Sequence, residues 1–221
     1  MITVALDYVP LILNGFILTV MVTVFGIFVG LGMGILLAIG DIHGGKLVSA
    51  VIRVYVEFFR GSPLLVQLLI GMYTIPTVLH FRISAFAVGF AVFALNSAAY
   101  QKGYIKGAME TVSKDQMEAG LSIGMSRAQS IFYIILPQAL RIVIPAWSNE
   151  FCSLTKSTAA LSLIGIADLT QAGTTITGLT YVILPTWLGI AAIYLAWITG
   201  FTKLADIVYE KKKIPGLEIS I

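Results

Sequence analysis

The feature that most constrains this sequence is a long apolar segment without any charged side chain, which lies between Asp7 and Asp41. About 20 consecutive apolar residues are enough for a helix to cross the hydrocarbon core of a bilayer, so we expect a transmembrane helix at 11–39. The composition agrees, because 58% of the 221 residues are hydrophobic and only 11% are charged, whereas about 25% of the residues in soluble domains are charged. The chain is predicted to be an all-α, polytopic membrane protein.

Further apolar segments predict about five transmembrane helices, all within the single domain 1–221. Pro76 predicts a break or tilt in the second helix, and Arg141, Glu150 and Lys156 interrupt the fourth. The Gly- and Thr-rich residues that precede the last helix predict a re-entrant or interfacial segment. The expected spans are, in chain order, 11–39, 62–80, 83–101, 128–157 and 184–208.

Lysine and arginine residues are concentrated on one side of the predicted spans. They follow the first, third and fifth spans, whereas the opposite side holds Arg82 and the segment after Lys156, which is nearly devoid of them. Cytoplasmic loops carry the excess of positive charge in membrane proteins. The N-terminus is therefore predicted to lie outside the cell and the C-terminus in the cytoplasm.

Three glycines recur at every fourth position of the first span, at Gly26, Gly30 and Gly34. Small residues at this spacing allow two helix backbones to approach closely in lipid. The pattern predicts close packing, either against another helix of the same chain or in a homodimer interface. Of the two, we favour packing within the chain.

The segment Gly40–Lys46 has the glycine and lysine spacing of a phosphate-binding loop, but Leu47 stands where Ser or Thr would hold Mg²⁺. The segment also follows a predicted transmembrane helix rather than a strand, and we interpret it as a polar cytoplasmic turn. The single Cys152 and the separate His43 and His80 offer no set of metal ligands. No catalytic residue and no metal ligand is predicted, and the chain is not expected to be an enzyme.

The longest polar stretch, 102–130, has the pattern of two helix starts. Ser113 and Ser126 are each followed three residues later by glutamine, which is the spacing of a capping box. A short helix is expected after Ser113, ending near Gly120 or Gly124, because glycine readily adopts the left-handed conformation at a helix end. A short helix of this kind is marginal alone, so it either packs on its own chain or docks into another protein.

Parts of this stretch and of the spans resemble a known family. Glu118-Ala119-Gly120, with Gly124 and then Ile135-Leu136-Pro137, resembles the EAA loop in permease subunits of ATP-binding-cassette (ABC) importers. The match continues, in order, along nearly the whole chain. The segments that are similar to the polar amino acid branch of these permeases include Arg60–Gln67, Leu95–Tyr100, Leu136–Arg141, Asn149–Phe151 and Ile164–Leu169.

The resemblance implies a type I importer permease fold in a prokaryotic inner membrane. The chain would form the translocation path for a polar amino acid by alternating access. The helix 113–124 would be a cytoplasmic coupling helix that docks into an ATPase subunit. The residues implied in coupling are Gln116, Glu118, Ala119, Gly120 and Gly124.

The resemblance also implies partners. Two cytoplasmic ATPase subunits would bind ATP and Mg²⁺, so this chain itself would need no cofactor. A second permease chain, identical or different, would complete the pore, and an extracytoplasmic solute-binding protein would deliver the amino acid. Membrane lipid surrounds the spans, and no nucleic acid partner is expected.

Polar side chains within the third and fourth spans are candidates for solute binding, because charged and polar groups in membrane helices usually face a polar path or one another. The Glu150 carboxylate, with the Asn149 amide, is expected to hold an ammonium or guanidinium group. Asn96 and Ser97 add neutral hydrogen-bonding groups. Alternatively, Glu150 forms a salt bridge with Lys156 or Arg141, and Asn96 joins two helices.

A second function remains open on physical grounds. Charges within the membrane also occur in secondary transporters, which couple solute movement to protons or sodium ions and need no ATPase. Such transporters are usually built from inverted repeats, and the sequence shows no convincing internal repeat. An importer driven by a separate ATPase is therefore the preferred prediction.

Overall fold

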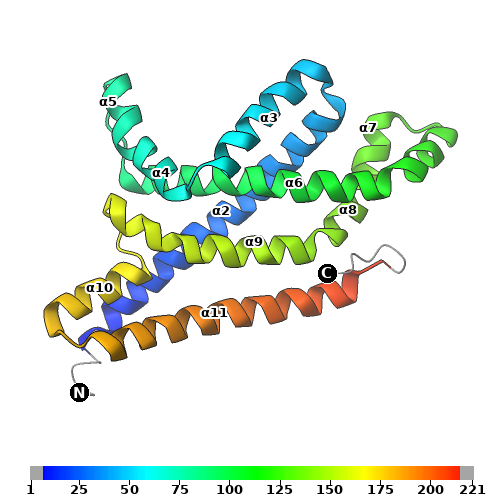
Figure 1. Cartoon of the computed structure of the whole chain (residues 1–221). Helices are drawn as coiled ribbons and strands as arrows, with labels where there is room; N and C mark the ends of the chain where they lie inside the picture. The colour runs from blue at the N-terminus through cyan, green and yellow to red at the C-terminus, as the bar shows by residue number, and fades with distance from the viewer. Residues whose placement is uncertain (1–6, 215–221) are drawn as a thin grey trace.

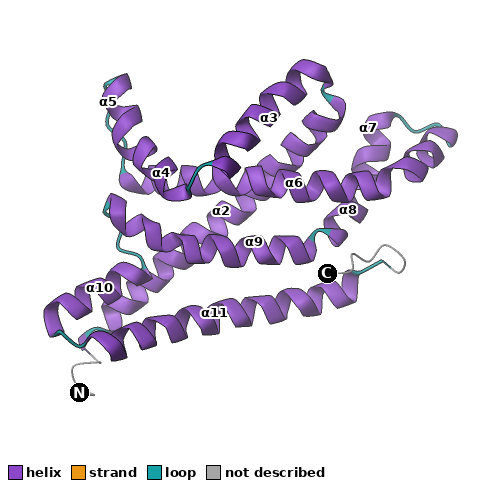
Figure 2. Cartoon of the chain, viewed as in Figure 1, coloured by secondary structure: helices purple, strands orange, loops and turns teal. Residues whose placement is uncertain are grey.

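The computed structural model describes residues 7–214, apart from the side chains at positions 113 and 114, and every regular element in this part of the chain is helical. Figures 1 and 2 show the arrangement. The elements are α2 (Val9–His43), α3 (Gly45–Gly61), α4 (Leu64–Leu69), the π-helix η1 (Ile70–Thr74), α5 (Ile75–Leu79), α6 (Ala85–Ser122), α7 (Arg127–Gln129), the π-helix η2 (Ser130–Ile135), α8 (Leu136–Ile142), α9 (Ile144–Ser157), the 3₁₀-helix η3 (Thr158–Ile164), α10 (Leu169–Thr180) and α11 (Ile183–Lys212).

Two of these helices, α2 and α11, are long and apolar enough to cross a membrane by themselves. Two further candidates are bent pairs: α3 with the α4–α5 segment, at 107°, and the segment 127–142 with the segment 144–164, at 58°. All five predicted spans fall mainly within helical segments, with the third in the first half of α6. The all-α, membrane-spanning fold class is confirmed, whereas the exact span boundaries stay predictions.

The bend between α3 and α4 arises from the local sequence. α3 ends at Gly61, Ser62 is extended with φ −111° and ψ 146°, and Pro63 precedes the first residue of α4. The helical conformation is disfavoured for the residue before a proline, so the chain leaves the helix at Ser62. A hydrogen bond of 2.6 Å from the Tyr55 hydroxyl to the Leu95 carbonyl fixes α3 against α6.

The glycine pattern of the first span packs α2 against α6. A Cβ atom on Gly26 would lie 3.2 Å from Phe93 Cβ, and one on Gly34 would lie 3.0 Å from Gln101 Cβ. All three glycines of the pattern are buried, including Gly30 between them. Packing within the chain, which we favoured over a homodimer interface, is therefore confirmed.

The predicted separate helix at 113–124 is wrong, because α6 runs without interruption from Ala85 to Ser122. Ser113 lies inside this helix rather than at its start. The apolar face that includes Ile105, Met109 and Val112 is buried against Ile131 and Ile135. This continuous packing favours extending the helix through Ser113, and a capping interaction there is not needed.

The helix ends of this region agree with the sequence. Gly124 has a φ of +85°, its N–H donates to the Leu121 carbonyl, and the N–H of Met125 donates to the Gly120 carbonyl. These two backbone hydrogen bonds together form the Schellman motif. Ser126 then forms the complete predicted capping box with Gln129.

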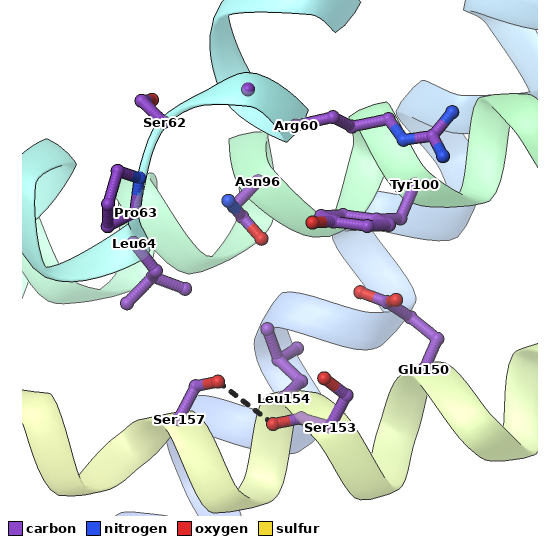
Figure 3. Close-up of a pocket in the computed structure, with 11 residues that line it drawn as sticks. Arg60, Ser62, Pro63, Leu64, Asn96, Tyr100, Glu150, Ser153, Leu154 and Ser157 are labelled. Carbon is purple, nitrogen blue, oxygen red and sulfur yellow. Dashed lines mark hydrogen bonds between the residues drawn. The ribbon is translucent and has the colours of Figure 1, made fainter.

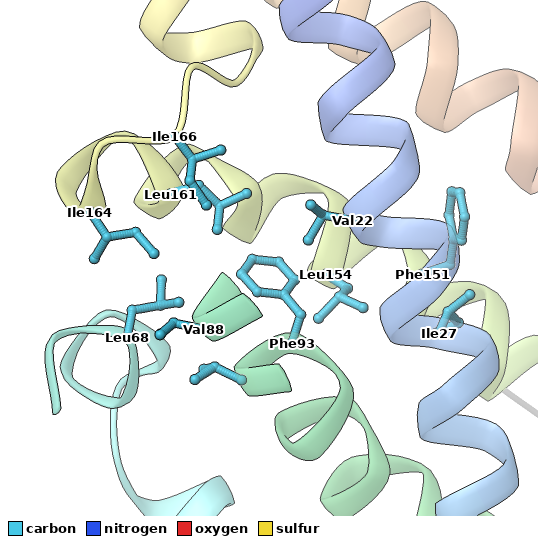
Figure 4. Close-up of a cluster of buried hydrophobic side chains, with 11 residues drawn as sticks. Val22, Ile27, Leu68, Val88, Phe93, Phe151, Leu154, Leu161, Ile164 and Ile166 are labelled. Atoms are coloured by element: carbon cyan, nitrogen blue, oxygen red, sulfur yellow. The ribbon is translucent and has the colours of Figure 1, made fainter. Parts of the chain in front are cut away.

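Two apolar clusters hold the helices together. The first joins α2, α6, α9 and η3 through side chains such as Val22, Phe93, Leu154 and Leu161 (Figure 4). The second lies around Ile105, in the half of α6 that leads to its C-terminal end. The candidate site described next is lined in part by Leu154 of the first cluster.

A group of charged residues joins α2 and α6 near the end of α2. Asp41 accepts hydrogen bonds from Lys102 Nζ at 2.6 Å and from Lys106 Nζ at 2.8 Å. The Ser49 hydroxyl of α3 donates to the same carboxylate. Three helices therefore meet at one buried carboxylate.

Candidate functional site

A pocket of about 370 Å³ lies between the α3–α4 bend, α6 and α9. Figure 3 shows the side chains of all three elements pointing toward the same space. Its walls carry one cation, one anion and several hydroxyl and amide groups. The lining residues are Arg60, Gly61, Ser62, Pro63, Leu64, Asn96, Tyr100, Glu150, Ser153, Leu154 and Ser157.

Asn96 both stabilises the bend and lines the pocket. Its Nδ2 donates to the Phe59 carbonyl at 3.1 Å and to Gln67 Oε1 at 3.0 Å. Gln67 Nε2 in turn donates to the Phe59 and Ser62 carbonyls. These bonds occupy the donor group of Asn96 and leave its carbonyl oxygen for the pocket. Both predicted roles of Asn96, joining helices and lining the site, are compatible with this geometry.

Glu150 lies on α9 with its side chain toward α6 and is only 5% exposed. Figure 3 shows its carboxylate near the Tyr100 ring. The guanidinium of Arg60 lies 5.2 Å from the centre of that ring and interacts electrostatically with Glu150. Within the described residues, no ion pair shorter than 4.0 Å joins Glu150 to Lys156 or Arg141. The alternative prediction of a structural salt bridge with either residue is therefore wrong.

The other two predicted site residues lie outside the pocket lining. Ser97 is fully buried, and its hydroxyl accepts a hydrogen bond of 2.9 Å from Gln101 Nε2. Asn149 is exposed and is not part of the pocket. Consecutive residues on an α-helix point about 100° apart, so Asn149 does not share the α9 face of Glu150. The prediction that Asn149 and Glu150 act together is not supported by this arrangement.

Sequence reasoning missed Arg60 and Tyr100 as site residues. Arg60 begins the Arg60–Gln67 segment, and Tyr100 ends the Leu95–Tyr100 segment. Both segments carried the family resemblance, so the sequence did mark these two positions. It assigned no role to either side chain. The packing of α3 against α6 brings Arg60 over the Tyr100 ring.

The residues implied in coupling gather at the C-terminal end of α6. Gln116, Glu118 and Ala119 are exposed there, and Gly120 is buried with its Cα close to Ser130. Gly124 forms the helix end described above. A second, mostly apolar pocket of about 280 Å³ adjoins this end and includes Glu118 in its lining. The five residues therefore form one end of the molecule, which we call the α6 tip.

The segment Gly120–Gly124 has the GxSxG spacing of serine hydrolases, but its geometry is different. Ser122 is the last residue of α6, and its hydroxyl donates to the Glu118 carbonyl at 2.8 Å. A nucleophilic serine of this motif needs a turn from a strand into a helix. Residues 7–214 also contain no group of three potential metal-ligating side chains.

Comparison with known proteins identifies the family. Residues 30–211 match the family of binding-protein-dependent transport system inner membrane components. The chain belongs to this family. It is thus a permease, a multi-pass component of the inner membrane that works with a separate binding protein, and the prediction of a transport subunit rather than an enzyme is confirmed.

Several characterised permeases are similar over most of their length. The glutamine transport system permease protein GlnP of Escherichia coli (strain K12) is 33% identical over 188 residues, which cover 85% of this permease and 86% of that protein. The arginine transport system permease protein ArtQ of Bacillus subtilis (strain 168) is 30% identical over 205 residues, covering 93% and 94%.

Solved structures share the fold. A crystal structure of an amino acid ABC transporter with histidines contains a chain with a TM-score of 0.84 and 35% identity, covering 94% of this permease and 96% of that chain. The inward-facing MetNI methionine ABC transporter gives a TM-score of 0.72 at 16% identity, with 93% and 96% covered. The predicted type I importer permease fold is therefore confirmed.

Proposed function

We propose that this permease forms the translocation path of an ATP-driven importer for a polar amino acid and that the solute occupies the pocket between the α3–α4 bend, α6 and α9. The observation that carries the proposal is the presence of Arg60 and Glu150 in the lining of one pocket. A free amino acid carries a carboxylate and an ammonium group, so it complements both. The volume of about 370 Å³ is near the lower end of the roughly 300–1,000 Å³ that is usual for small-molecule sites.

In the proposed complex, Glu150 accepts hydrogen bonds from the ammonium group or from a cationic side chain of the solute, and Arg60 binds its carboxylate. Asn96 and the hydroxyls of Ser153 and Ser157 supply neutral partners. Charges within a membrane protein are stabilised mainly when they are paired. The solute therefore provides counter-charges that the pocket itself offers only at longer range.

The coupling proposal rests on the continuity of α6. The helix carries Asn96 and Tyr100 at the pocket and the exposed Gln116, Glu118 and Ala119 at its tip. A helix of 38 residues without a break transmits a displacement of one end to the other. An ATPase subunit that moves the α6 tip therefore also moves one wall of the pocket. ATP and Mg²⁺ are bound by that partner, since this chain has no phosphate-binding loop.

The proposed assembly has two ATPase subunits below the membrane and a second permease chain, identical or different, beside this one. The solute-binding protein docks on the outer face. The orientation, with the N-terminus outside and the C-terminus in the cytoplasm, is supported by the distribution of lysine and arginine. Lipid contacts the apolar outer faces of the helices.

Transport by reconstituted complexes tests this function. The permease, its ATPase and its solute-binding protein are placed in lipid vesicles, and uptake of tritiated L-arginine, L-glutamine and L-glutamate is measured with and without ATP. We expect uptake of at least one of them, only with ATP. Uptake that persists without ATP, or that an imposed proton or sodium gradient drives, would contradict the proposal and favour a secondary transporter.

Two variants test the site. Glu150→Gln is expected to lower uptake by about tenfold or more, because a charge-assisted hydrogen bond contributes about 1.5–3 kcal/mol. Asn149→Ala is the matched control, since its side chain is exposed on the neighbouring position of the same helix. Assembly is checked by gel filtration for both variants. Normal uptake by Glu150→Gln would show that the pocket is not the solute site.

A further inference from the structure

Helix α3 has three different sides along its length. Successive residues of an α-helix point about 100° apart, so Ile52, Tyr55 and Phe59 share one side, and Tyr55 hydrogen-bonds there to α6. The second side carries exposed apolar side chains, which are Leu47, Val51, Val54 and Phe58. The third side, which we call the charged face of α3, consists of Lys46, Arg53, Glu57 and Arg60, all of them exposed.

The charged face leads directly into the pocket. Arg60 belongs to both, and Lys46 lies about 21 Å from it along the axis, at a rise of 1.5 Å per residue. Figure 1 shows α3 running from the end of α2 to the bend that precedes α4. Near the start of α3, Ser49 donates to Asp41, which is paired with Lys102 of α6. The charged face therefore connects the pocket with the end of α2.

No charge on this face has an ionic partner among the side chains that the structure describes. No ion pair of 4.0 Å or less there includes Lys46, Arg53, Glu57 or Arg60. A lysine or arginine at the centre of a bilayer costs about 2.5–3.5 kcal/mol, so such groups face a water-filled cavity or a polar partner. The exposed apolar side of α3 suits contact with lipid, and the charged face is a different side of the helix.

Helix α6 leaves room next to the charged face. A Cβ atom on Gly103 would have only Arg60 Nη1 within 4 Å, at 3.5 Å, and one on Gly107 would have no atom within 4 Å. Gly107 lies one turn farther from the pocket on the same side of α6, about 6 Å along the axis. The surface of α6 beyond Tyr100 is therefore open beside the Arg60 side chain.

We infer that the charged face of α3 is one wall of the path by which the solute leaves the pocket, and that Arg53 receives the solute carboxylate after Arg60. The inference rests on the proposed function, in which the solute occupies the pocket. A free amino acid carries charges of both signs, and Arg53 and Glu57, one helical turn apart, offer one partner for each. In the proposed orientation this path ends in the cytoplasm.

An anionic membrane surface fits this face less well than the solute does. The segments that bind anionic lipid carry clusters of about 4–8 lysine and arginine residues. The charged face has three basic residues and also Glu57, which anionic headgroups would repel. Arg60 moreover lies in the lining of the pocket between the helices.

The first test measures which side of α3 meets water. Cys152 is the only cysteine of the chain, so Cys152→Ser gives a background without thiols. Ala50→Cys, beside the charged face, and Val51→Cys, on the apolar side, are compared in this background. The complex of permease and ATPase in lipid nanodiscs is treated with the anionic reagent 2-sulfonatoethyl methanethiosulfonate, and modification of the permease is followed by mass spectrometry.

We expect Ala50→Cys to react about tenfold faster than Val51→Cys or more, because the reactive thiolate forms readily only in water. Similar rates at the two positions would overturn the inference. Both variants keep every charge of α3, so the comparison does not depend on whether a charge substitution assembles.

The same variant tests whether the solute passes this face. A bulky maleimide is attached to Ala50→Cys before the complete importer is reconstituted in vesicles. The probe is whichever of tritiated L-arginine, L-glutamine and L-glutamate the wild type transports fastest. The maximal rate should fall about fivefold or more, since release often limits turnover, while the half-saturating concentration stays unchanged. An unchanged maximal rate would overturn the inference.

A charge substitution tests the role of Arg53 itself. Arg53→Gln should lower the maximal rate about threefold to tenfold, because it removes electrostatic attraction along the path, without changing the half-saturating concentration. Arg53→Lys keeps the charge and should retain most of the rate. Lys203→Gln, at an exposed lysine of α11, is the control. Normal uptake by Arg53→Gln, an equal loss in Arg53→Lys, or a change confined to the half-saturating concentration would overturn the inference.

Vesicle composition separates the solute from lipid as the occupant. Uptake by Arg53→Gln is measured in phosphatidylcholine alone and with added phosphatidylglycerol. A path for the solute predicts the same loss in both. A loss that appears only with the anionic lipid would assign Arg53 to headgroup binding and overturn the inference.

The failure of this inference is separable from the failure of the proposed function. Normal uptake by Glu150→Gln, or wild-type uptake that persists without ATP, would count against the proposed function itself. Impaired uptake by Glu150→Gln together with normal uptake by Arg53→Gln and by the labelled Ala50→Cys would overturn only the exit path.

Discussion

Replacing Gly15 with alanine should force α2 away from the start of α10. A Cβ atom on Gly15 would lie 2.7 Å from the Asp168 carbonyl oxygen and 2.9 Å from its carbon. These are backbone atoms at a helix start, where Asp168 caps α10 and the N–H of Leu169 donates to Thr19 Oγ1 at 3.2 Å. Neither can move by rotating a side chain, so the helices must separate.

A matched substitution isolates this steric term. Gly32 lies in the same helix, is exposed, and has no atom within 4 Å of an added Cβ. Alanine increases helix stability at both positions by about 0.5–1 kcal/mol, so this gain cancels in the comparison. Overpacking of a close contact costs about 1–3 kcal/mol. The free energy of unfolding of Gly15→Ala should therefore be lower than that of Gly32→Ala by this amount.

The difference can be measured by thermal unfolding of the two purified variants, followed by tryptophan fluorescence. For a chain of this size, 1 kcal/mol corresponds to about 2–4 °C in Tm, so Gly15→Ala should unfold about 2–12 °C below Gly32→Ala. Equal Tm values for both variants would refute the reasoning, because they would show that α2 and α10 do not approach as closely as the structure indicates.

Three further perturbations have defined outcomes. Asp41→Asn leaves Lys102 buried without its counter-charge and should lower the free energy of unfolding by about 3 kcal/mol. Lys106→Gln changes a side chain that is 32% exposed and should lower the free energy of unfolding by less than about 1 kcal/mol. Similar Tm values for the two variants would contradict this difference. Ser126→Ala removes the capping box and should lower Tm by about 2–4 °C, since a cap contributes about 1 kcal/mol; an unchanged Tm would show that the cap is dispensable. Glu118→Lys, which reverses a charge on the α6 tip, should reduce co-purification with the ATPase relative to an Asp115→Lys control, and normal recovery of the ATPase would count against docking at Glu118.

The local features of the fold could be predicted because each depends on a short stretch of sequence. The helix end at Gly124 and the capping box at Ser126 follow from the conformations that these residues prefer. The close packing of α2 follows from the spacing of its glycines. Ser113 carried an equally good capping pattern, yet it lies inside α6, because burial of the apolar face around Met109 outweighs a local start signal.

The candidate site was only partly predictable for a similar reason. Glu150 and Asn96 stood out because polar groups are rare within apolar segments, and both line the pocket. Asn149 had the same signal and points elsewhere, since the face of a helix that lines a cavity depends on how the helix is packed. Arg60 lies at a helix end, where a charge is unremarkable, and it reaches the pocket because α3 packs against α6.

The sequence by itself determined that this chain is helical and embedded in a membrane, and which family it belongs to. Apolar run length, capping residues and ordered motifs are properties of neighbouring residues, so they can be read along the chain. The tertiary structure alone decided that α6 joins the pocket to the α6 tip without a break, and that Arg60, Tyr100 and Glu150 converge. These features depend on the packing of helices that are distant in sequence. Each packing contact joins residues from two such helices, so no single segment of the sequence indicates it.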